Sequence, residues 1–169
     1  MKYDPEIHHR RSIRLKNYDY SQEGYYFITI CTQNREDYFL DKRVIEMIEK
    51  WWYILPDKFL NVEIDEFIVM SNHIHGIIVI INKSVGADLC VCQNVKRGEH
   101  TGLPLPEIIQ WFKTMTTNEY IRNVKKLKWR PFDGKLWQRN YYEHIIRNED
   151  ELNRTREYII NNPIKHKKI

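Results

Sequence analysis

Two histidines separated by one residue offer the clearest chemistry in this 169-residue sequence. His73 and His75 flank Ile74 at the start of the apolar run "HIHGIIVII". If this run is a β-strand, the two histidines point to one side, about 6.6 Å apart along the chain, and Ile74 packs on the other. Their imidazoles can then converge on one ion about 2 Å from each nitrogen. The alternative is a pair of histidines satisfied by local hydrogen bonds, so a metal site requires further ligands.

Two residues near the C-terminus could complete such a site. Tyr158 and Asn162 are four positions apart, so in a helix they lie about 40° apart around the axis. If Leu152 and Ile159 mark the core stripe, Tyr158 lies on the flank, from which its ring can extend. A tyrosine hydroxyl is a usable nucleophile when a metal polarises the electrophile, although its pKa near 10 otherwise keeps it protonated. An ordinary flank residue of an amphipathic helix is the other interpretation of Tyr158.

Tyr141 and Tyr142 are competing candidates for the nucleophile. They are neighbours in a predicted strand, so their rings face opposite ways and only one can share the side of the histidine pair. We favour Tyr158, because only this tyrosine has Asn162 four residues later.

The elements that must position these residues are predicted in the order strand, helix, strand, strand, helix, strand, helix. Strands are predicted at 25–32, 61–70, 74–81 and 135–146, and the middle two form an antiparallel hairpin that turns at 71–73. This order is typical of an α+β, ferredoxin-like fold of the split βαβ type. Such a fold has an antiparallel sheet with helices on one face, and here a C-terminal helix carries Tyr158.

Three helices are predicted from apolar residues at helical spacing. The first begins after Asp41 as N-cap and ends before Pro56, and the second follows Pro106 and is succeeded by a basic linker. The third begins at Asn148 as N-cap, has acidic residues in its first turn and stops at Pro163. The segment 83–104 lacks periodicity and is predicted to be a flexible insertion in a single domain that covers residues 1–169.

Composition and charge favour a globular protein with an anionic partner. The sequence is 42% hydrophobic and carries a net charge of +4, and the positive residues are clustered. Such clusters can follow a phosphate backbone while exposed aromatic residues such as Trp129 stack on unpaired bases. Solvated surface charge explains any single cluster equally well. The candidate DNA contacts are Arg10, Arg11, Arg14, Lys125, Lys126, Lys128 and Arg130.

Cysteine usage and hydropathy exclude other classes. Cys31, Cys90 and Cys92 form no disulfide framework, and the Cys-x-Cys pair lacks the second pair that a zinc site needs. No stretch approaches the ~20 apolar residues of a membrane span, and no signal peptide is evident. We therefore expect a cytoplasmic protein with reduced thiols and no membrane partner, associated with the nucleoid when bound to DNA.

The sequence resembles the REP-associated tyrosine transposases, within the superfamily of single-tyrosine HUH endonucleases that includes small insertion-sequence transposases. The resemblance covers nearly the whole chain. It rests on "HHRRSIRLKNYDYSQEGYYFITICTQNR", "VMSNHIHGIIVI" and "LWQRNYYEHIIRNEDELNRTREYIINNP". Ser71 stands where the family usually has proline, and serine also suits a turn.

The resemblance implies metal-dependent cleavage and joining of hairpin-forming, single-stranded DNA on a ferredoxin-like fold. By position, His73 and His75 match the HUH pair that binds Mg²⁺ or Mn²⁺, and Asn162 matches the polar residue that completes the coordination. Tyr158 matches the nucleophile that forms a 5′-phosphotyrosine intermediate. Members of the family act as monomers or homodimers, so both states are open for this chain.

Two other functions stay open at this point. A domesticated nucleic-acid-binding protein could keep the fold and lose the activity, although such a binder has no need of all four site residues. A two-histidine phosphoesterase with a water nucleophile would want a second His-x-Thr/Ser motif, and the sequence contains none.

Overall fold

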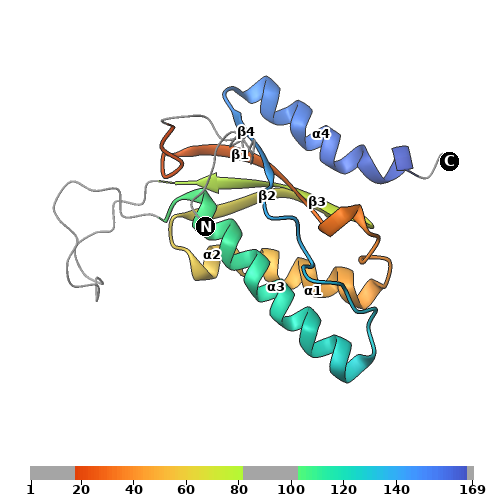
Figure 1. Cartoon of the computed structure of the whole chain (residues 1–169). Coiled ribbons are helices and arrows are strands. Elements are labelled where there is room, and N and C mark those ends of the chain that lie inside the picture. The colour runs from red at the N-terminus through yellow and green to blue at the C-terminus, as the bar shows by residue number, and fades with distance from the viewer. Residues whose placement is uncertain (1–17, 82–102, 167–169) are drawn as a thin grey trace, which may run out of the picture.

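The computed structural model describes residues 18–81 and 103–166. In these ranges the strands are β1 (Gly24–Cys31), β2 (Val62–Val69), β3 (His73–Ile80) and β4 (Tyr142–Ile146). The helices are α1 (Lys42–Tyr53), α2 (Leu55–Lys58), α3 (Leu105–Leu127) and α4 (Glu149–His166), with a short 3₁₀ turn, η1 (Gln33–Arg35). The strands form one antiparallel sheet in the order β2-β3-β1-β4 (Figure 1). Since β3 lies between β1 and β2, the predicted split βαβ, ferredoxin-like fold is confirmed.

The sheet separates two layers of helices. Tyr26, Ile28 and Ile30 alternate along β1 and are fully buried in the main hydrophobic core, which also contains residues of α1 and α3. The residues between them, such as Phe27, face the other side, which is covered by α4. Figure 1 shows α1 and α3 below the sheet and α4 above it. Successive side chains of β1 point to opposite faces of the sheet, so one set packs on the layer that contains α1 and α3 and the other set faces α4.

The face under α4 has its own, smaller cluster of buried apolar residues. Ile77 and Val79 of β3 and Ile146 of β4 pack there with Leu152 and Ile159 of α4. The predicted core stripe of the C-terminal helix is thus confirmed. Because this cluster is small, polar contacts contribute to where α4 docks.

The N-cap of α1 is the predicted one, and α3 is longer at its C-terminal end than predicted. The carboxylate of Asp41 accepts a hydrogen bond from the backbone N–H of Arg43, as an N-cap should. Helix α3 continues to Leu127 and ends where Lys128 adopts a left-handed φ of 57°. Lys125 and Lys126 are therefore in its last turn, and the predicted basic linker is in part helical.

The predicted strand at 135–146 is too long. Only Tyr142–Ile146 pairs with β1, and before it Trp137 forms an isolated bridge with Thr32. The reason lies in α3, where the amine of Lys113 donates to the carbonyls of residues 138, 139 and 140 at 3.0 to 3.3 Å. These hydrogen bonds turn the three carbonyls toward α3 instead of toward a neighbouring strand.

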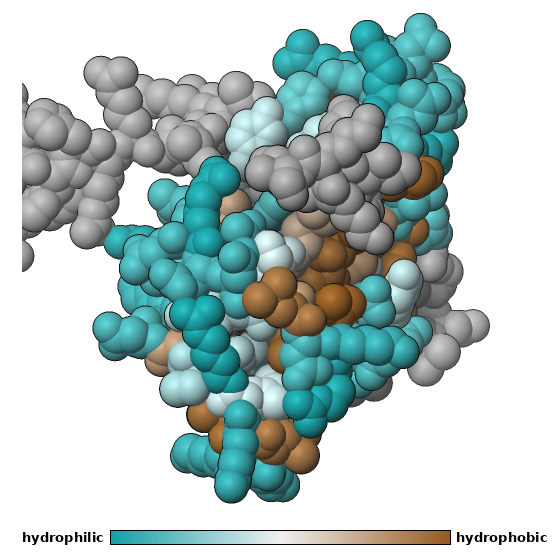
Figure 2. Space-filling view, turned by 90° about the vertical axis from the view of Figure 1, so that its right-hand side faces the viewer, coloured by the Kyte–Doolittle hydropathy of each residue, from teal (hydrophilic) through white to brown (hydrophobic). Residues whose placement is uncertain are grey.

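The structure describes only part of the residues on which the predictions about cysteines and the insertion rest. Cys31 is a free thiol, whereas Cys90 and Cys92 lie outside the described residues. The predicted insertion at 83–104 also lies outside them, except for Leu103 and for Pro104, which is the N-cap of α3. No helix in the described ranges is long and apolar enough to cross a membrane. The face shown in Figure 2 is mostly hydrophilic where it is coloured, with a hydrophobic patch near the centre of the view.

Candidate metal and nucleophile site

The histidine pair is positioned by the hairpin between β2 and β3. The backbone N–H of Met70 donates to the carbonyl of His73 at 2.8 Å, which leaves Ser71 and Asn72 as a two-residue turn. Ile74 is fully buried in the main core, as predicted. His73 and His75 therefore lie on the face that α4 covers.

The two imidazoles approach each other through their Nε2 atoms, which are 3.2 Å apart. Each ring is held at its Nδ1 atom: His73 contacts the side-chain oxygen of Asn72 at 2.7 Å, and His75 contacts the hydroxyl of Thr29 at 2.7 Å. Because an amide oxygen only accepts, the Nδ1 of His73 carries the proton and its Nε2 keeps a lone pair. Two nitrogens about 2.1 Å from one ion and at right angles to each other would be about 3.0 Å apart, so this pair fits a chelate.

Tyr158 of α4 meets this pair from above the sheet. Its hydroxyl lies 3.4 Å from Nε2 of His75, and the two ring centroids are 5.3 Å apart. Phe27 of β1 stacks on His75 at 5.5 Å and contacts the ring of Tyr158 edge-on at 6.0 Å. Tyr158 is 44% exposed, so its hydroxyl can meet a large substrate.

Asn162 follows one helical turn after Tyr158 and is only 4% exposed. Its Nδ2 atom is buried and has no hydrogen-bond partner among the described residues. Rotation of the amide by half a turn would exchange this nitrogen for the oxygen, which is the atom that binds a divalent cation. No three His, Cys, Asp or Glu side chains cluster in the described ranges.

The two competing tyrosines face opposite ways, as predicted. Tyr141 is 7% exposed and belongs to the main core, whereas Tyr142 is 54% exposed and contacts Phe27 on the side of the histidine pair. The contact with His75 is made by Tyr158.

The first turn of α4 is fixed to β4 by a capping arrangement. Asn148 accepts from the backbone N–H of Glu151 at 2.9 Å, so the predicted N-cap is confirmed. The Glu151 carboxylate accepts in turn from the backbone N–H of Arg147 and contacts Nε2 of His144. The hydrogen bond from Arg147, with a smaller contribution from His144, lowers the pKa of Glu151.

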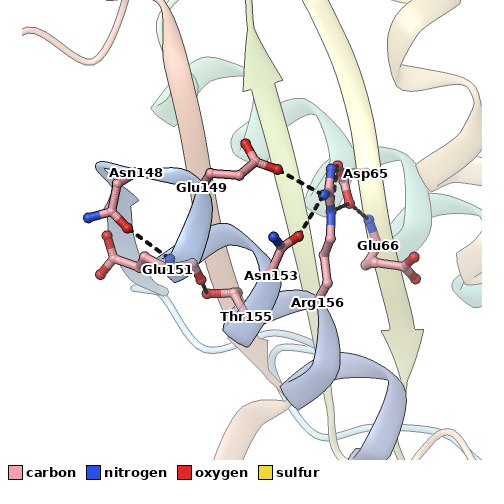
Figure 3. Close-up of polar contacts among 8 residues, drawn as sticks. All are labelled: Asp65, Glu66, Asn148, Glu149, Glu151, Asn153, Thr155 and Arg156. Carbon is pink, nitrogen blue, oxygen red and sulfur yellow. Dashed lines mark hydrogen bonds and ion pairs between the residues drawn. The ribbon is translucent and has the colours of Figure 1, made fainter.

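The middle of α4 is fixed to the far edge of the sheet by a bidentate ion pair. Arg156 donates through Nη2 and Nε to both carboxylate oxygens of Asp65 at 2.6 and 3.0 Å (Figure 3). The hydrogen bonds from Arg156 lower the pKa of Asp65. Asp65 lies where the pairing of β2 with β3 shifts between Ile64 and Phe67. A bulge of this kind re-aims a side chain, and here it directs the carboxylate of Asp65 at α4.

Of the predicted DNA contacts, the four that the structure describes are not brought to this site. Arg10, Arg11 and Arg14 lie outside the described residues. Lys125, Lys126, Lys128 and Arg130 lie at the C-terminal end of α3, which Figure 1 shows below the sheet while α4 lies above it.

The prediction that Trp129 is exposed for base stacking is wrong. Trp129 is only 5% exposed and packs against Tyr120 with ring centroids 5.2 Å apart, because the chain folds back after α3. The neighbouring Arg130 forms an ion pair with Glu36 at 2.8 Å and lies over the ring of Tyr38. These contacts give both residues a role in the packing of α3.

Sequence reasoning missed three residues that hold the site. Asn72 orients His73 and could have been found, because it is part of the "SNHIHG" motif. Thr29 and Phe27 contact His75 from β1, more than 40 residues earlier in the chain. Only the register of β1 against β3, which pairs Thr29 with His75, reveals their proximity.

The chain is similar in sequence to a transposase family model and to two curated proteins. Residues 99–162 match the family model "Transposase IS200 like". An uncharacterized protein of Haemophilus influenzae Rd is 42% identical over 96% of this chain and 93% of its own length. A second protein of the same organism, named provisionally as a REP-associated tyrosine transposase, is 23% identical over 90% of this chain and 78% of its own length.

A solved structure of a REP-associated tyrosine transposase bound to a REP hairpin has a similar fold. The TM-score is 0.60 at 18% identity, and the match covers 93% of this chain and 74% of that one. At this identity the likeness bears on the fold alone. Together with the family-model match over residues 99–162 and the 23% identical relative, it makes the chain similar to IS200-like and REP-associated tyrosine transposases.

Proposed function

We propose that this protein is a metal-dependent endonuclease and strand transferase that acts on hairpin-forming, single-stranded DNA. Tyr158 would be the nucleophile, and His73, His75 and Asn162 would hold Mg²⁺ or Mn²⁺. The observation that carries the proposal is the position of the Tyr158 hydroxyl. It lies 3.4 Å from Nε2 of His75, and this nitrogen lies 3.2 Å from Nε2 of His73. A nucleophile and two metal-ligating atoms are thus within reach of one phosphate group.

In the proposed step, the Tyr158 oxygen attacks the scissile phosphorus and the bond from phosphorus to the 3′ oxygen breaks. The tyrosine proton goes to solvent, and the leaving oxygen takes up a proton to become a free 3′-hydroxyl. The product is a 5′-phosphotyrosine in which the phosphodiester energy is conserved. Attack by another 3′-hydroxyl reverses the reaction and joins a new strand without an external energy source.

The donor set fits a divalent ion, and the chemistry that such an ion supplies is polarisation of a phosphoryl oxygen. Imidazole is a better ligand for Mn²⁺ than for the harder Mg²⁺, so Mn²⁺ is the better probe in vitro. The part that the chain plays is orientation. Asn72 and Thr29 hold the imidazoles, and Phe27 packs against both His75 and Tyr158.

The test is incubation with labelled hairpin DNA carrying a single-stranded flank, in Mn²⁺ or in EDTA. We expect a covalent protein–DNA adduct that forms only with the metal and is absent in Tyr158→Phe. Tyr53→Phe is the matched control, since Tyr53 is 60% exposed on α1, on the opposite face of the sheet. Adduct formation by Tyr158→Phe would refute the assignment of the nucleophile. Binding without any adduct would favour an inactive DNA-binding protein.

A further inference from the structure

A cavity of about 460 Å³ opens beside Tyr158, between β4 and the first half of α4. It is lined by Phe27, Tyr142, His144, Glu151, Arg154, Thr155 and Tyr158. Its volume is in the range of small-molecule sites, roughly 300 to 1,000 Å³. The catalytic step proposed above uses Tyr158 from this set, with Phe27 packed against it, and Glu151 and His144 fix the start of α4. Tyr142 and Arg154 have no role in either arrangement.

Tyr142 gives the cavity an aromatic surface that faces solvent. Its ring contacts Phe27 edge-on with centroids 6.4 Å apart, yet 54% of the residue stays exposed. Tyr142 also lies opposite Thr29, which lies opposite His75, so all three share one row across β4, β1 and β3. At about 4.8 Å between strands, Tyr142 is about 10 Å from the histidine pair in the plane of the sheet.

The charges around the cavity favour an anion at one position. The Glu151 carboxylate accepts a hydrogen bond from the backbone N–H of Arg147 and contacts Nε2 of His144, so these two contacts hold it at the start of α4. Arg154 donates its Nε–H only to the carbonyl of Asp150 within α4 and forms no ion pair with the described residues. It differs in this from Arg156 on the same helix, whose guanidinium is bound to Asp65. The terminal nitrogens of Arg154 can therefore donate to a phosphate.

We propose that this cavity binds the unpaired nucleotide next to the scissile phosphate, with its base stacked on Tyr142 and its other phosphate bound by Arg154. The inference rests on the proposed function, because it takes Tyr158 to mark the scissile phosphate. A DNA strand that passes Tyr158 has to leave across one side of α4, and this side offers an aromatic ring and a guanidinium. Base–aromatic stacking needs a base that is unpaired, which explains a preference for single strands.

The test combines a protein variant with a DNA variant. Binding of a fluorescent hairpin with a single-stranded flank is measured by anisotropy in EDTA, so that no cleavage interferes. We expect Tyr142→Ala to weaken binding about tenfold, while Tyr142→Phe retains it because the ring stays. Replacing one flanking nucleotide by an abasic site should weaken wild-type binding to a similar extent. The same abasic substitution should not weaken the binding of Tyr142→Ala any further.

Arg154→Ala should lower the dependence of log Kd on log salt concentration by about 0.7, the value for one phosphate contact to a single strand. Tyr53→Ala and Lys42→Ala are matched controls on α1, with exposed side chains on the other face of the sheet. Both should bind as the wild type does.

Wild-type binding by Tyr142→Ala, or additive losses at every abasic position, would overturn the inference. These results differ from a failure of the proposed function. In that case the wild type forms no adduct with Mn²⁺, whereas the anisotropy measurement still reports on the cavity.

Discussion

At the scale of single residues, the site depends on what each histidine contacts at Nδ1. A metal-binding imidazole almost always donates the N–H of its other nitrogen to a partner, which fixes the orientation of the ring. Asn72 provides that partner for His73 and Thr29 for His75, each at 2.7 Å. The side chain of Thr29 thus determines both the orientation of His75 and the nitrogen that faces His73.

We predict that Thr29→Val weakens Mn²⁺ binding by about 10- to 100-fold, as loss of such a supporting contact generally does. Valine has the shape of threonine without the hydroxyl, so His75 loses its Nδ1 partner while the strand remains. Calorimetric titration of the apoprotein with Mn²⁺ measures the effect. Thr114→Val is the matched control, because Thr114 bonds only within α3. Equal affinities for Thr29→Val and the wild type would exclude this role.

At the scale of elements, β3 is shaped by both of its faces. Gly76 follows His75 directly, and on its other side the indole of Trp52 stacks on Phe67 with centroids 4.3 Å apart. A Cβ atom at residue 76 would overlap the Trp52 ring and lie 2.9 Å from Phe67. The glycine of "HIHG" thus serves the packing of α1 on the sheet.

Gly76→Ala should therefore lower the free energy of unfolding by about 1 to 3 kcal/mol, the usual cost of overpacking a core. Urea unfolding followed by tryptophan fluorescence measures it. Trp52→Phe in the same chain should restore part of the loss, because the smaller ring lacks the clashing atoms. If the double variant is as unstable as the sum of both single ones, the clash with Trp52 is not the cause.

The ion pair between α4 and β2 predicts a defined pH dependence. Arg156 holds the pKa of Asp65 below its ordinary value of 3.8. A carboxyl group whose pKa is lower in the folded state stabilises the fold above its unfolded pKa, and this contribution is lost as pH falls through the folded pKa. Asp65→Asn should thus lower the melting temperature from neutral pH down to about pH 5.

The difference between Asp65→Asn and the wild type should shrink once pH falls below about 3.9, the pKa of an unfolded aspartate, and should be lost below the lowered pKa of Asp65 in the fold. Circular dichroism melts between pH 7 and pH 3 test this. Glu63→Gln, on an exposed position of the same strand, is the control and should show no such profile. A difference that stays constant over this range would rule out the ion pair as its source.

At the scale of the whole molecule, the site is assembled across two hydrophobic clusters of unequal size. The histidine-bearing sheet is built on the main core, whereas α4 and its Tyr158 rest on the smaller cluster with Ile77 and Val79. Regions with few buried apolar contacts open at lower free energy than the rest. The element that carries the proposed nucleophile thus has fewer buried apolar contacts than the sheet that carries the histidines.

We predict that backbone amides of α4 exchange hydrogen through partial openings, at a lower free energy than amides of β1 and β3. Native-state hydrogen exchange with mass spectrometry resolves these segments. Asp65→Asn should accelerate hydrogen exchange in α4 and leave the exchange rates of β1 unchanged, because it removes only the ion pair between α4 and β2. Uniform exchange across α4 and the sheet would show instead that the molecule opens as one unit.

Local periodicity in the sequence was sufficient for the element order, the fold class and the face on which the histidines lie. Alternation separates Ile74 from His73 and His75, and helical spacing separates Tyr158 from Ile159. These properties depend on neighbours a few positions away, so the sequence displays them directly. The caps at Asp41 and Asn148 are local in the same sense.

Only the tertiary structure decided which distant residues meet. The contact of Thr29 with His75 depends on strand register, and that of Asp65 with Arg156 depends on a bulge in β2. The burial of Trp129 depends on how the chain returns over α3. In each case the partner is set by packing between elements far apart in the chain, which no local pattern encodes. The sequence by itself determined the chemical groups of the site, and the docking of α4 on the sheet determined that they lie together.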